Sequence, residues 1–378
     1  MFTAISPSPQ APWRLITVDN PAGAGPQQPA MTVRILTVVG ARPQFVKAAA
    51  VSRAIAAGSA VTEEMVHTGQ HFDPEMSDVF FRELGIPEPA HHLEIHGGGH
   101  GQMTGRMLEK LETVMTVRRP DLVLVYGDTN STLAGALAAV KLGIPVAHVE
   151  AGLRSWNRAM PEEINRVLTD HVSALLFCPT AAAAANLARE GITCGVHQVG
   201  DVMYDATLDA RRRARENAGI LPRLGLTPGG YALATVHRAE NTGDARTLAA
   251  VLDYLRARAR RRPVLLPLHP RTRQAAARFG LTFDGLRTIP PVGYLDMAAL
   301  LEGCAEVLTD SGGVQKEAYF HRKPCITLRG ETEWVETVEA GWNRLWTGPE
   351  PGPRRDIPDY GDGHAAEKIA ALLAAVPV

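Results

Sequence analysis

Three carboxylates in this chain of 378 residues could transfer protons, and each falls where a strand is expected to end or a helix to begin. They are Asp128, Glu150 and Glu162. Any one of them could instead cap a helix or lie on a solvated face, because Asp and Glu favour those positions. Three acids that converge on one site are harder to explain in that way. We therefore interpret them as a set of acid/base groups.

A histidine followed directly by an arginine, His237-Arg238, offers an acid/base imidazole beside a guanidinium. This pair suits an anionic leaving group, because a guanidinium forms charge-assisted hydrogen bonds with phosphate oxygens. Two other loops that are expected to follow strands contain Arg154 and His269. We expect these side chains to contact the same substrate.

A Ser-Gly-Gly turn, Ser311-Gly312-Gly313, joins an expected strand to an expected helix. Its backbone N–H groups and its hydroxyl would lie at a helix N-terminus, which favours a diphosphate. Glu317, one turn further along, can accept hydrogen bonds from a ribose. Taken alone, such a turn is more often just a tight connection without a ligand.

Other phosphate and metal motifs are missing or poorly placed. The sequence has no GxxxxGK[ST], and no GxGxxG follows the first expected strand, which argues against P-loop and nicotinamide chemistry. The histidines at 92, 96 and 100 imitate the spacing of metal ligands on a helix. Three consecutive glycines at 97–99 make a helix improbable there, so we expect a loop and no metal.

The elements that must position these residues follow one repeated pattern. From residue 33, short β-rich runs alternate with Gly- or Pro-marked loops and amphipathic stretches, which is typical of βα units and parallel sheets. Parallel sheets bind ligands beyond the carboxyl ends of their strands, where the candidate residues are expected. The expected strands span residues 33–39, 121–126, 145–149, 174–178, 231–236, 264–268, 306–309 and 325–328, and the expected helices include 45–56, 130–142, 161–171 and 180–190.

Composition and length set the number of domains. A chain of 378 residues with 45% hydrophobic content can form two cores. Residues 1–30 are rich in proline, so we expect a disordered extension there. We expect an N-terminal Rossmann-like domain over 31–202, a C-terminal one over 203–361, and a terminal helix within 362–378 that returns to the first domain.

Charge and cysteine usage exclude several classes of partner. Lys and Arg total 39 against 40 Asp and Glu, so no basic excess attracts nucleic acid or anionic lipid. No apolar stretch reaches the roughly 18 residues that span a bilayer, and no secretion signal is evident. The four cysteines are far apart and form no CxxC pair, which indicates free thiols and a cytoplasmic protein.

Ten ordered motifs together resemble the non-hydrolysing UDP-N-acetylglucosamine 2-epimerases over about residues 32–350. This set is far more specific than any single motif. The family resemblance implies two Rossmann-like domains in a GT-B arrangement, an interdomain active-site cleft, a homodimer and no cofactor. The motifs are GARPQ, HTGQHFD, YGDTNSTLAGALAA, HVEAGLRS, MPEEINR, VGDVMYDA, HRAEN, PLHPRTR, DSGGVQKEA and ETEWVE.

The resemblance also implies roles for single residues. By motif, the acid/base carboxylates of the family fall on Asp128, Glu150 and Glu162. The contacts to the UDP leaving group fall on residues from both domains, namely Arg42, Lys47, His237, Ser311, Gly312, Gly313 and Glu317.

The expected reaction inverts C2 of a UDP-linked 2-acetamido sugar, UDP-GlcNAc to UDP-ManNAc, by elimination and re-addition of UDP through a 2-acetamidoglucal. GARPQ, PLHPRTR and ETEWVE are typical of the branch that acts on UDP-2,3-diacetamido-2,3-dideoxy-glucuronate, so that substrate stays open. Three further functions stay open at this point, namely those of a GT-B glycosyltransferase, a non-catalytic sugar-nucleotide sensor and a hydrolysing relative.

Overall fold

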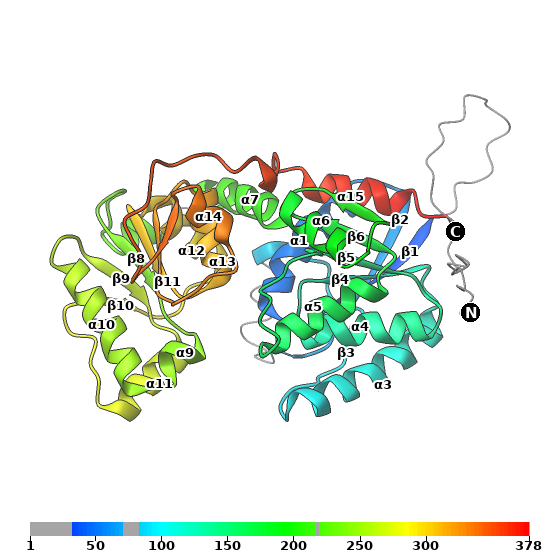
Figure 1. Cartoon of the computed structure of the whole chain (residues 1–378), viewed down its shortest axis with the longest axis horizontal. Coiled ribbons are helices and arrows are strands. Elements are labelled where there is room, and N and C mark those ends of the chain that lie inside the picture. Colours follow the sequence, from blue (N-terminus) through cyan, green and yellow to red (C-terminus); the bar gives the residue numbers. More distant parts are fainter. Residues whose placement is uncertain (1–31, 71–82, 217–218, 378) are drawn as a thin grey trace, which may run out of the picture.

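The protein forms two α/β halves, which Figure 1 shows side by side with helix α7 (Val202–Glu216) between them. The structure is a computed structural model and describes residues 32–70, 83–216 and 219–377. The extension expected over residues 1–30 lies outside this part. The described residues form one parallel sheet of seven strands and one of six, as two Rossmann-like domains require.

The first sheet has the strand order β3-β2-β1-β4-β5-β6-β7, and all its pairs are parallel. Its central strands are continuous apolar runs because helices cover both faces of a parallel sheet. Both β4 and β5 are buried at every position. The strands are β1 (Val33–Val39), β2 (Val61–His67), β3 (His91–His92), β4 (Leu122–Tyr126), β5 (Val146–Val149), β6 (Leu175–Cys178) and β7 (Val196–Gln198).

The second sheet has the order β10-β9-β8-β11-β12-β13 and is also entirely parallel. Two apolar clusters of its own surround this sheet, and the cluster of the first sheet also takes in Tyr319 and Phe320 from the second half. The strands are β8 (Ala232–Thr235), β9 (Val264–Pro267), β10 (Arg287–Ile289), β11 (Glu306–Thr309), β12 (Cys325–Thr327) and β13 (Asn343–Leu345).

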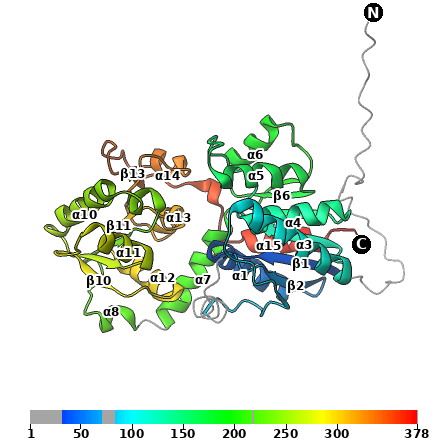
Figure 2. The ribbon, with the colours of Figure 1, turned by 90° about the horizontal axis from the view of Figure 1, so that it is seen from below.

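Helices cover the sheets in the order expected of βα units. In Figure 2, α1 and α15 can be followed beside β1 and β2. The first half contains α1 (Arg42–Ala56), α3 (His100–Arg118), α4 (Asn130–Lys141), α5 (Pro161–Val172) and α6 (Ala181–Arg189). The second contains α8 (Ile220–Arg223), α9 (Ala239–Thr242), α10 (Ala245–Ala259), α11 (Pro270–Phe279), α12 (Tyr294–Gly303), α13 (Gly312–Phe320) and α14 (Val335–Glu339).

The C-terminal helix α15 (Ala365–Ala374) packs on α1 and β2 of the first half and on α7. Its Ile369 and Leu373 are fully buried in the core of the first half. The chain therefore returns across the boundary after completing the second sheet. The short segment η1 (Pro358–Tyr360) precedes this helix, and the carbonyl of Tyr360 accepts a hydrogen bond from Asp201 N at 3.0 Å.

Each sheet has one point at which the direction of strand addition reverses. In the first sheet this switch point lies between β1 and β4, and in the second between β8 and β11. Ligands of open α/β sheets bind beyond the strand ends at such points. The loops that leave these four strands begin at Gly40, Gly127, Val236 and Asp310, where the sequence motifs are concentrated.

The predicted strands agree with the structure within two residues at each end, and 33–39 and 306–309 agree at both ends. The predicted helix 45–56 begins earlier, at Arg42. Pro43 is tolerated in a first helical turn, and the side chain of Gln44 accepts hydrogen bonds from Gly40 N and Ala41 N at 2.8 and 3.0 Å. Among the described residues, no helix is long and apolar enough to cross a membrane.

Candidate active site

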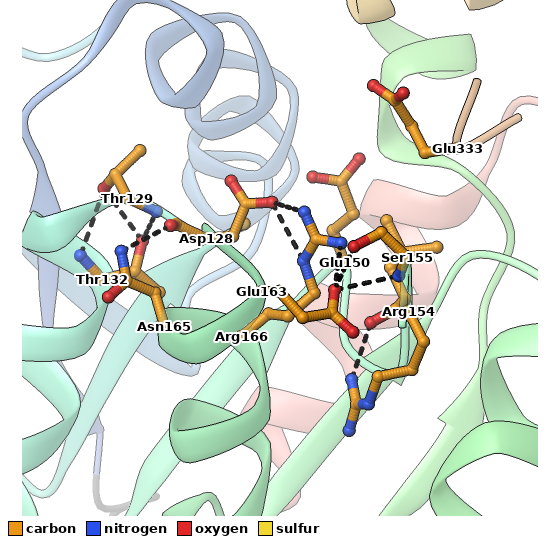
Figure 3. Close-up of polar contacts among 12 residues, drawn as sticks. Asp128, Thr129, Thr132, Glu150, Arg154, Ser155, Glu163, Asn165, Arg166 and Glu333 are labelled. Atoms are coloured by element: carbon orange, nitrogen blue, oxygen red, sulfur yellow. Dashed lines mark hydrogen bonds and ion pairs between the residues drawn. The ribbon is translucent and has the colours of Figure 1, made fainter. Parts of the chain in front are cut away.

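Asp128 lies at the first switch point, in the loop after β4, and is held by an arginine. Its carboxylate pairs with Arg166 of α5, whose Nε lies 3.1 Å from Asp128 Oδ2. Arg166 also bonds Glu163 at 2.8 Å, and Glu163 in turn accepts from Ser155 N and Trp156 N at 2.9 Å each. Figure 3 shows this chain of contacts, with Glu150 next to it. The Asp128 side chain keeps 32% exposure, so a fixed carboxylate remains open to a ligand.

Glu150, directly after β5, lies between two lysines. One carboxylate oxygen pairs with Lys47 of α1, and the other lies 3.1 Å from Lys316 Nζ of α13. Burial raises the pKa of Glu150, but the two ammonium groups outweigh this effect and lower the pKa to about 2. Glu150 is therefore ionised at neutral pH.

The backbone of Glu150 is left-handed, with φ at 71°. A non-glycine residue in this region costs of order 1–3 kcal/mol, a cost that is common where a side chain must be aimed at a functional site. Gly127 faces the same carboxylate, and a Cβ there would lie 3.3 Å from Glu150 Oε2 and 3.4 Å from Lys47 Nζ. A glycine at 127 leaves room for this ion pair.

The contact between Lys316 and Glu150 also orients the two halves. Lys316 belongs to the helix after β11, and Glu150 follows β5. The carboxyl edges of the two sheets therefore face each other. In Figure 3, Glu333 lies across from the Asp128–Arg166 pair.

Glu162 lies exposed in the first turn of α5, and no hydrogen bond or ion pair joins its side chain to another residue that the structure describes. The neighbouring Glu163 is the buried member of this pair.

The structure corrects the expectation for Arg154. Its guanidinium is fully buried and bonds Asp170 and Glu190 at 2.7 Å each, so it cannot contact a substrate in this state. Asp170 also bonds His148 Nδ1 at 2.7 Å, and His148 Nε2 lies 2.7 Å from the carbonyl oxygen of Gly127. Arg154 therefore belongs to a buried network that supports the loop before Asp128.

At the second switch point, a buried carboxylate organises the His-Arg loop. Asp310 accepts hydrogen bonds from His237 N and Arg238 N at 2.9 Å and from Asn241 Nδ2 at 3.0 Å. The His237 ring stacks on His269 with centroids 5.3 Å apart, and its Nδ1 lies 3.5 Å from Asp310 Oδ1. His237 keeps 34% exposure, so its ring is oriented and still accessible.

Helix α13 begins at this switch point with Ser311 as its N-cap. The Ser311 hydroxyl lies 3.5 Å from Val314 N, a long bond that leaves the hydroxyl free to serve a ligand as well. Around Gly312 the structure holds the carboxylate of Glu333 and the indole of Trp334, so a Cβ at Gly312 would collide with Glu333. Trp334 Nε1 is buried without a hydrogen-bond partner. These donors at a helix N-terminus suit an anion.

Glu317 lies one turn further along α13, on a small cavity between α7, α12 and α13. Tyr294, Thr207 and His321 also line this cavity. Burial raises the pKa of Glu317 to about 7, and the nearby Lys316 only partly offsets this effect. A carboxyl group that ionises near neutral pH beside a cavity can bind the hydroxyl groups of a ligand.

Arg154 and Glu162 join no cluster of the expected residues, because Arg154 turns into a buried network and the side chain of Glu162 forms no hydrogen bond or ion pair with the other described site residues. The other expected residues lie in two places: Asp128, Glu150 and Lys47 beside the first switch point, and His237, Arg238, His269, Ser311, Gly312, Gly313 and Glu317 at or just after the second. The side chain of Arg42 lies outside the described part of the chain. Sequence reasoning missed Arg166, Asp310, Lys316 and Asp201. Each of these four residues lies inside one of the ten motifs, so the motifs pointed to the right segments. Which charged residues pair across the two halves could not be predicted from their order in the sequence.

Among residues 32–70, 83–216 and 219–377, no three His, Cys, Asp or Glu side chains form a group that could hold a metal ion.

Two facing parallel sheets with ligand loops at both switch points define an α/β protein of the GT-B type. Comparison with known proteins narrows this class. The family model described as UDP-N-acetylglucosamine 2-epimerase matches residues 53–374. The chain belongs to this family and has the fold of a 2-epimerase.

Similar proteins come from bacteria and archaea. The UDP-2,3-diacetamido-2,3-dideoxy-D-glucuronate 2-epimerase of Pseudomonas aeruginosa is 51% identical, over 90% of this chain and 99% of that protein. A UDP-N-acetylglucosamine 2-epimerase homolog of Methanococcus maripaludis is 52% identical with the same coverage. The crystal structure of Methanocaldococcus jannaschii UDP-GlcNAc 2-epimerase with UDP-GlcNAc and UDP superposes with a TM-score of 0.82, at 39% identity over 91% of this chain and 99% of that one.

Proposed function

We propose that this enzyme inverts C2 of a UDP-linked 2-acetamido sugar, with UDP-GlcNAc and UDP-ManNAc as the pair of epimers. The observation that carries the proposal is the opposition of two unlike sites. Asp128 and Glu150 lie at one sheet edge, and the N-terminus of α13 lies at the edge that faces it, with Lys316 bonded across. Acid/base groups and a diphosphate site are what a UDP-sugar epimerase needs.

The second half holds the leaving group in this proposal. The N–H groups at the start of α13 and the Ser311 hydroxyl bind the diphosphate, and His237 and Arg238 add charge and a proton donor. His269 supports the ring of His237. Glu317 accepts hydrogen bonds from the ribose hydroxyls. Arg42 and Lys47 contribute cations from the first half, as the family resemblance implies.

The first half carries the chemistry at C2. C2 of a 2-acetamido sugar has no adjacent carbonyl, so deprotonation without oxidation is difficult. In an elimination, a base takes the proton from C2, the C1–O bond breaks with its electrons passing to UDP, and a C1–C2 double bond forms. A proton then reaches the opposite face of C2 while UDP re-adds at C1.

The three carboxylates share these proton transfers. Glu150 is ionised at neutral pH, so it is in the form that can accept a proton or stabilise positive charge. Asp128 and the exposed Glu162 are then the candidates for delivering a proton to C2.

A second candidate substrate is UDP-2,3-diacetamido-2,3-dideoxy-glucuronate, favoured by 51% identity to a relative named for it. The same residues at C1 and C2 would serve both substrates, because the two differ only at C3 and C6. A glycosyltransferase would need an acceptor, and a sensor would have no use for the proton-transfer groups.

The domain boundaries, the oligomeric state and the location belong to the same proposal. We propose domains over 31–202 and 203–361 with the chain end returning to the first, which the sheet membership of the strands and the packing of α15 support. A homodimer and a cytoplasmic location are what the family resemblance implies, and the four free cysteines fit a reducing compartment.

The experiment incubates the protein with each candidate UDP-sugar and no acceptor, and follows the products by NMR. The proposal expects the C2 epimer to accumulate with UDP still attached. Free UDP with a released amino sugar would indicate a hydrolase, and no reaction with either substrate would contradict the proposal.

A further inference from the structure

Lys316 is a fully charged side chain with almost no exposure, and no role for it follows from the diphosphate site. Only 2% of its side chain is exposed. Its Nζ lies 2.6 Å from Asp201 Oδ2 and 3.1 Å from Glu150 Oε1. The ammonium also lies 4.0 Å from the centroid of the Trp334 ring. Desolvating an ammonium is costly, so a lysine is retained at such a position only when its contacts compensate for the cost.

Lys316 and its two ionic partners lie in three places that matter to the reaction. Glu150 is a proposed proton-transfer group, and Asp201 precedes α7, where the chain passes between the halves. Lys316 itself lies on α13, whose N-terminus is the proposed diphosphate site, and it immediately precedes Glu317. One ammonium therefore links the reacting carboxylate, the connection between the halves and the nucleotide helix.

We propose that Lys316 is a positioning residue that, together with Lys47, clamps the Glu150 carboxylate in its ionised form and ties it to the nucleotide-binding helix. The expected effect of Lys316 on turnover rests on the proposed function. The effect of Lys316 on the ionisation of Glu150 does not, and it can be tested without substrate.

The geometry gives the two lysines different tasks. Lys47 belongs to the same half as Glu150, so its ion pair survives any movement between the halves. Lys316 belongs to the other half, so its bond with Glu150 exists only while the halves are as close as they are here. The second clamp on Glu150 is therefore complete only when α13 is in place.

Other charged groups lie around Lys316, Glu150 and Asp201 and could also affect the ionisation of Glu150. Arg166 of α5 lies near Glu150, and Glu317 lies near Lys316. Glu336 of α14 bonds the Tyr360 hydroxyl at 3.0 Å and lies near both Lys316 and Asp201. Of these groups, only Lys47 and Lys316 donate hydrogen bonds to the Glu150 carboxylate. Removing the Lys316 charge should therefore act first on Glu150 and Asp201.

The test follows the titration of Glu150 by NMR in protein labelled with ¹³C at the glutamate carboxyl groups, with the signal assigned by its loss in Glu150→Gln. In Lys316→Met, which keeps an apolar stem against Trp334, we expect Glu150 to titrate about 1–3 pH units higher than in the wild type. A shift below half a unit in a folded Lys316→Met variant would overturn the proposal.

Asp201→Asn is the matched control, because it removes a charge from the same cluster and leaves Lys316 bonded to Glu150. Loss of this negative neighbour should leave the titration of Glu150 unchanged or lower it. An upward shift like that of Lys316→Met would mean that general disruption, and not the ammonium, is responsible. If Lys316→Met fails to fold, Lys316→Gln, which also removes the charge and keeps a long side chain, is titrated in its place with the same expected upward shift.

Turnover provides the second readout. In Lys316→Met the acidic limb of the kcat profile should move to higher pH, and the change should vanish in a Glu150→Gln background, where no carboxylate remains to be clamped. A uniform loss of kcat at all pH values would contradict the proposal. If the wild type converts neither UDP-sugar, the proposed function fails, and the NMR titration still decides whether Lys316 clamps Glu150.

Discussion

The two sheet edges that face each other in this enzyme use different chemistry. At the first edge, the candidate groups are side-chain carboxylates held by cations, as in the pairs of Asp128 with Arg166 and of Glu150 with Lys47. At the second edge, the carboxylate at the switch point, Asp310, is buried and serves the backbone N–H groups of the loop after β8. What this edge offers to a ligand is N–H groups, a hydroxyl and the side chains of that loop.

We infer that the first edge transfers protons and the second edge binds the diphosphate. Proton transfer needs groups whose charge can change, whereas holding a diphosphate needs donors that are already in place before the ligand arrives. The comparison predicts that substitutions at the first edge lower kcat and leave nucleotide binding intact, and that substitutions at the second edge do the reverse.

The largest effect should come from Asp128→Asn or Glu150→Gln. A positioned acid/base group typically contributes 10²–10⁴-fold to the rate, so kcat should fall by about that factor. The Kd for UDP, measured by calorimetry, should stay within about threefold of the wild type, because UDP lacks the sugar that these carboxylates address. A comparable loss of UDP affinity would remove the distinction between the edges.

Among substitutions at the second edge, Asp310→Asn should weaken nucleotide binding most. The buried carboxylate accepts from two backbone N–H groups and from Asn241, and a neutral amide cannot accept all three bonds. We expect UDP affinity to fall at least tenfold, and the free energy of unfolding in urea to fall by about 1.5–3 kcal/mol, the range for hydrogen bonds to charged groups. Unchanged UDP binding would show that the loop after β8 does not serve the nucleotide.

Ser311→Ala tests the N-terminus of α13 and should have a smaller effect than Asp310→Asn. Loss of the N-cap should lower the free energy of unfolding by about 1 kcal/mol and weaken UDP binding by several-fold. Thr180 is a matched control, because its hydroxyl caps α6 by accepting from Ala183 N at 3.2 Å. Thr180→Ala should cost similar stability and leave UDP binding unchanged; equal losses of affinity in both variants would point to stability alone.

Glu317→Gln should leave UDP binding at high pH nearly unchanged and alter only its dependence on pH. The pKa of Glu317 is raised by burial to about 7, and accepting hydrogen bonds from ribose hydroxyls favours its ionised form. UDP should therefore bind more tightly at pH 8 than at pH 6, by up to about tenfold for a group with this pKa. Glu317→Gln should lose this part of the pH dependence and keep only the part due to UDP itself. Identical pH profiles would exclude Glu317 from the binding site.

Much of the fold could be predicted from the sequence, because buried parallel strands such as β4 and β5 are uninterrupted apolar runs between loop signals. The short edge strands β3, β7, β10 and β13 gave no such signal, since they have two or three residues each and include polar positions. Edge strands are defined by their neighbours more than by their own sequence.

The sequence motifs predicted which loops form the candidate site. They did not predict which partners the side chains in those loops would contact. Arg154 follows a strand as Glu150 does, yet its guanidinium turns into a buried network with Asp170 and Glu190. Lys316 stands beside Glu317 in the sequence and reaches across to the other half. Which way a side chain points, and which distant charge it meets, depends on how the two halves pack together.

The central claim is that C2 is deprotonated and reprotonated between these two edges. The most direct measurement is the NMR spectrum of the product that the wild-type enzyme forms from UDP-GlcNAc, and separately from the diacetamido uronate, in deuterated water. The account predicts that the inverted product carries deuterium at C2, because the incoming proton comes from a carboxyl group that exchanges with solvent. Inversion with the original hydrogen retained at C2 in every product molecule would contradict it.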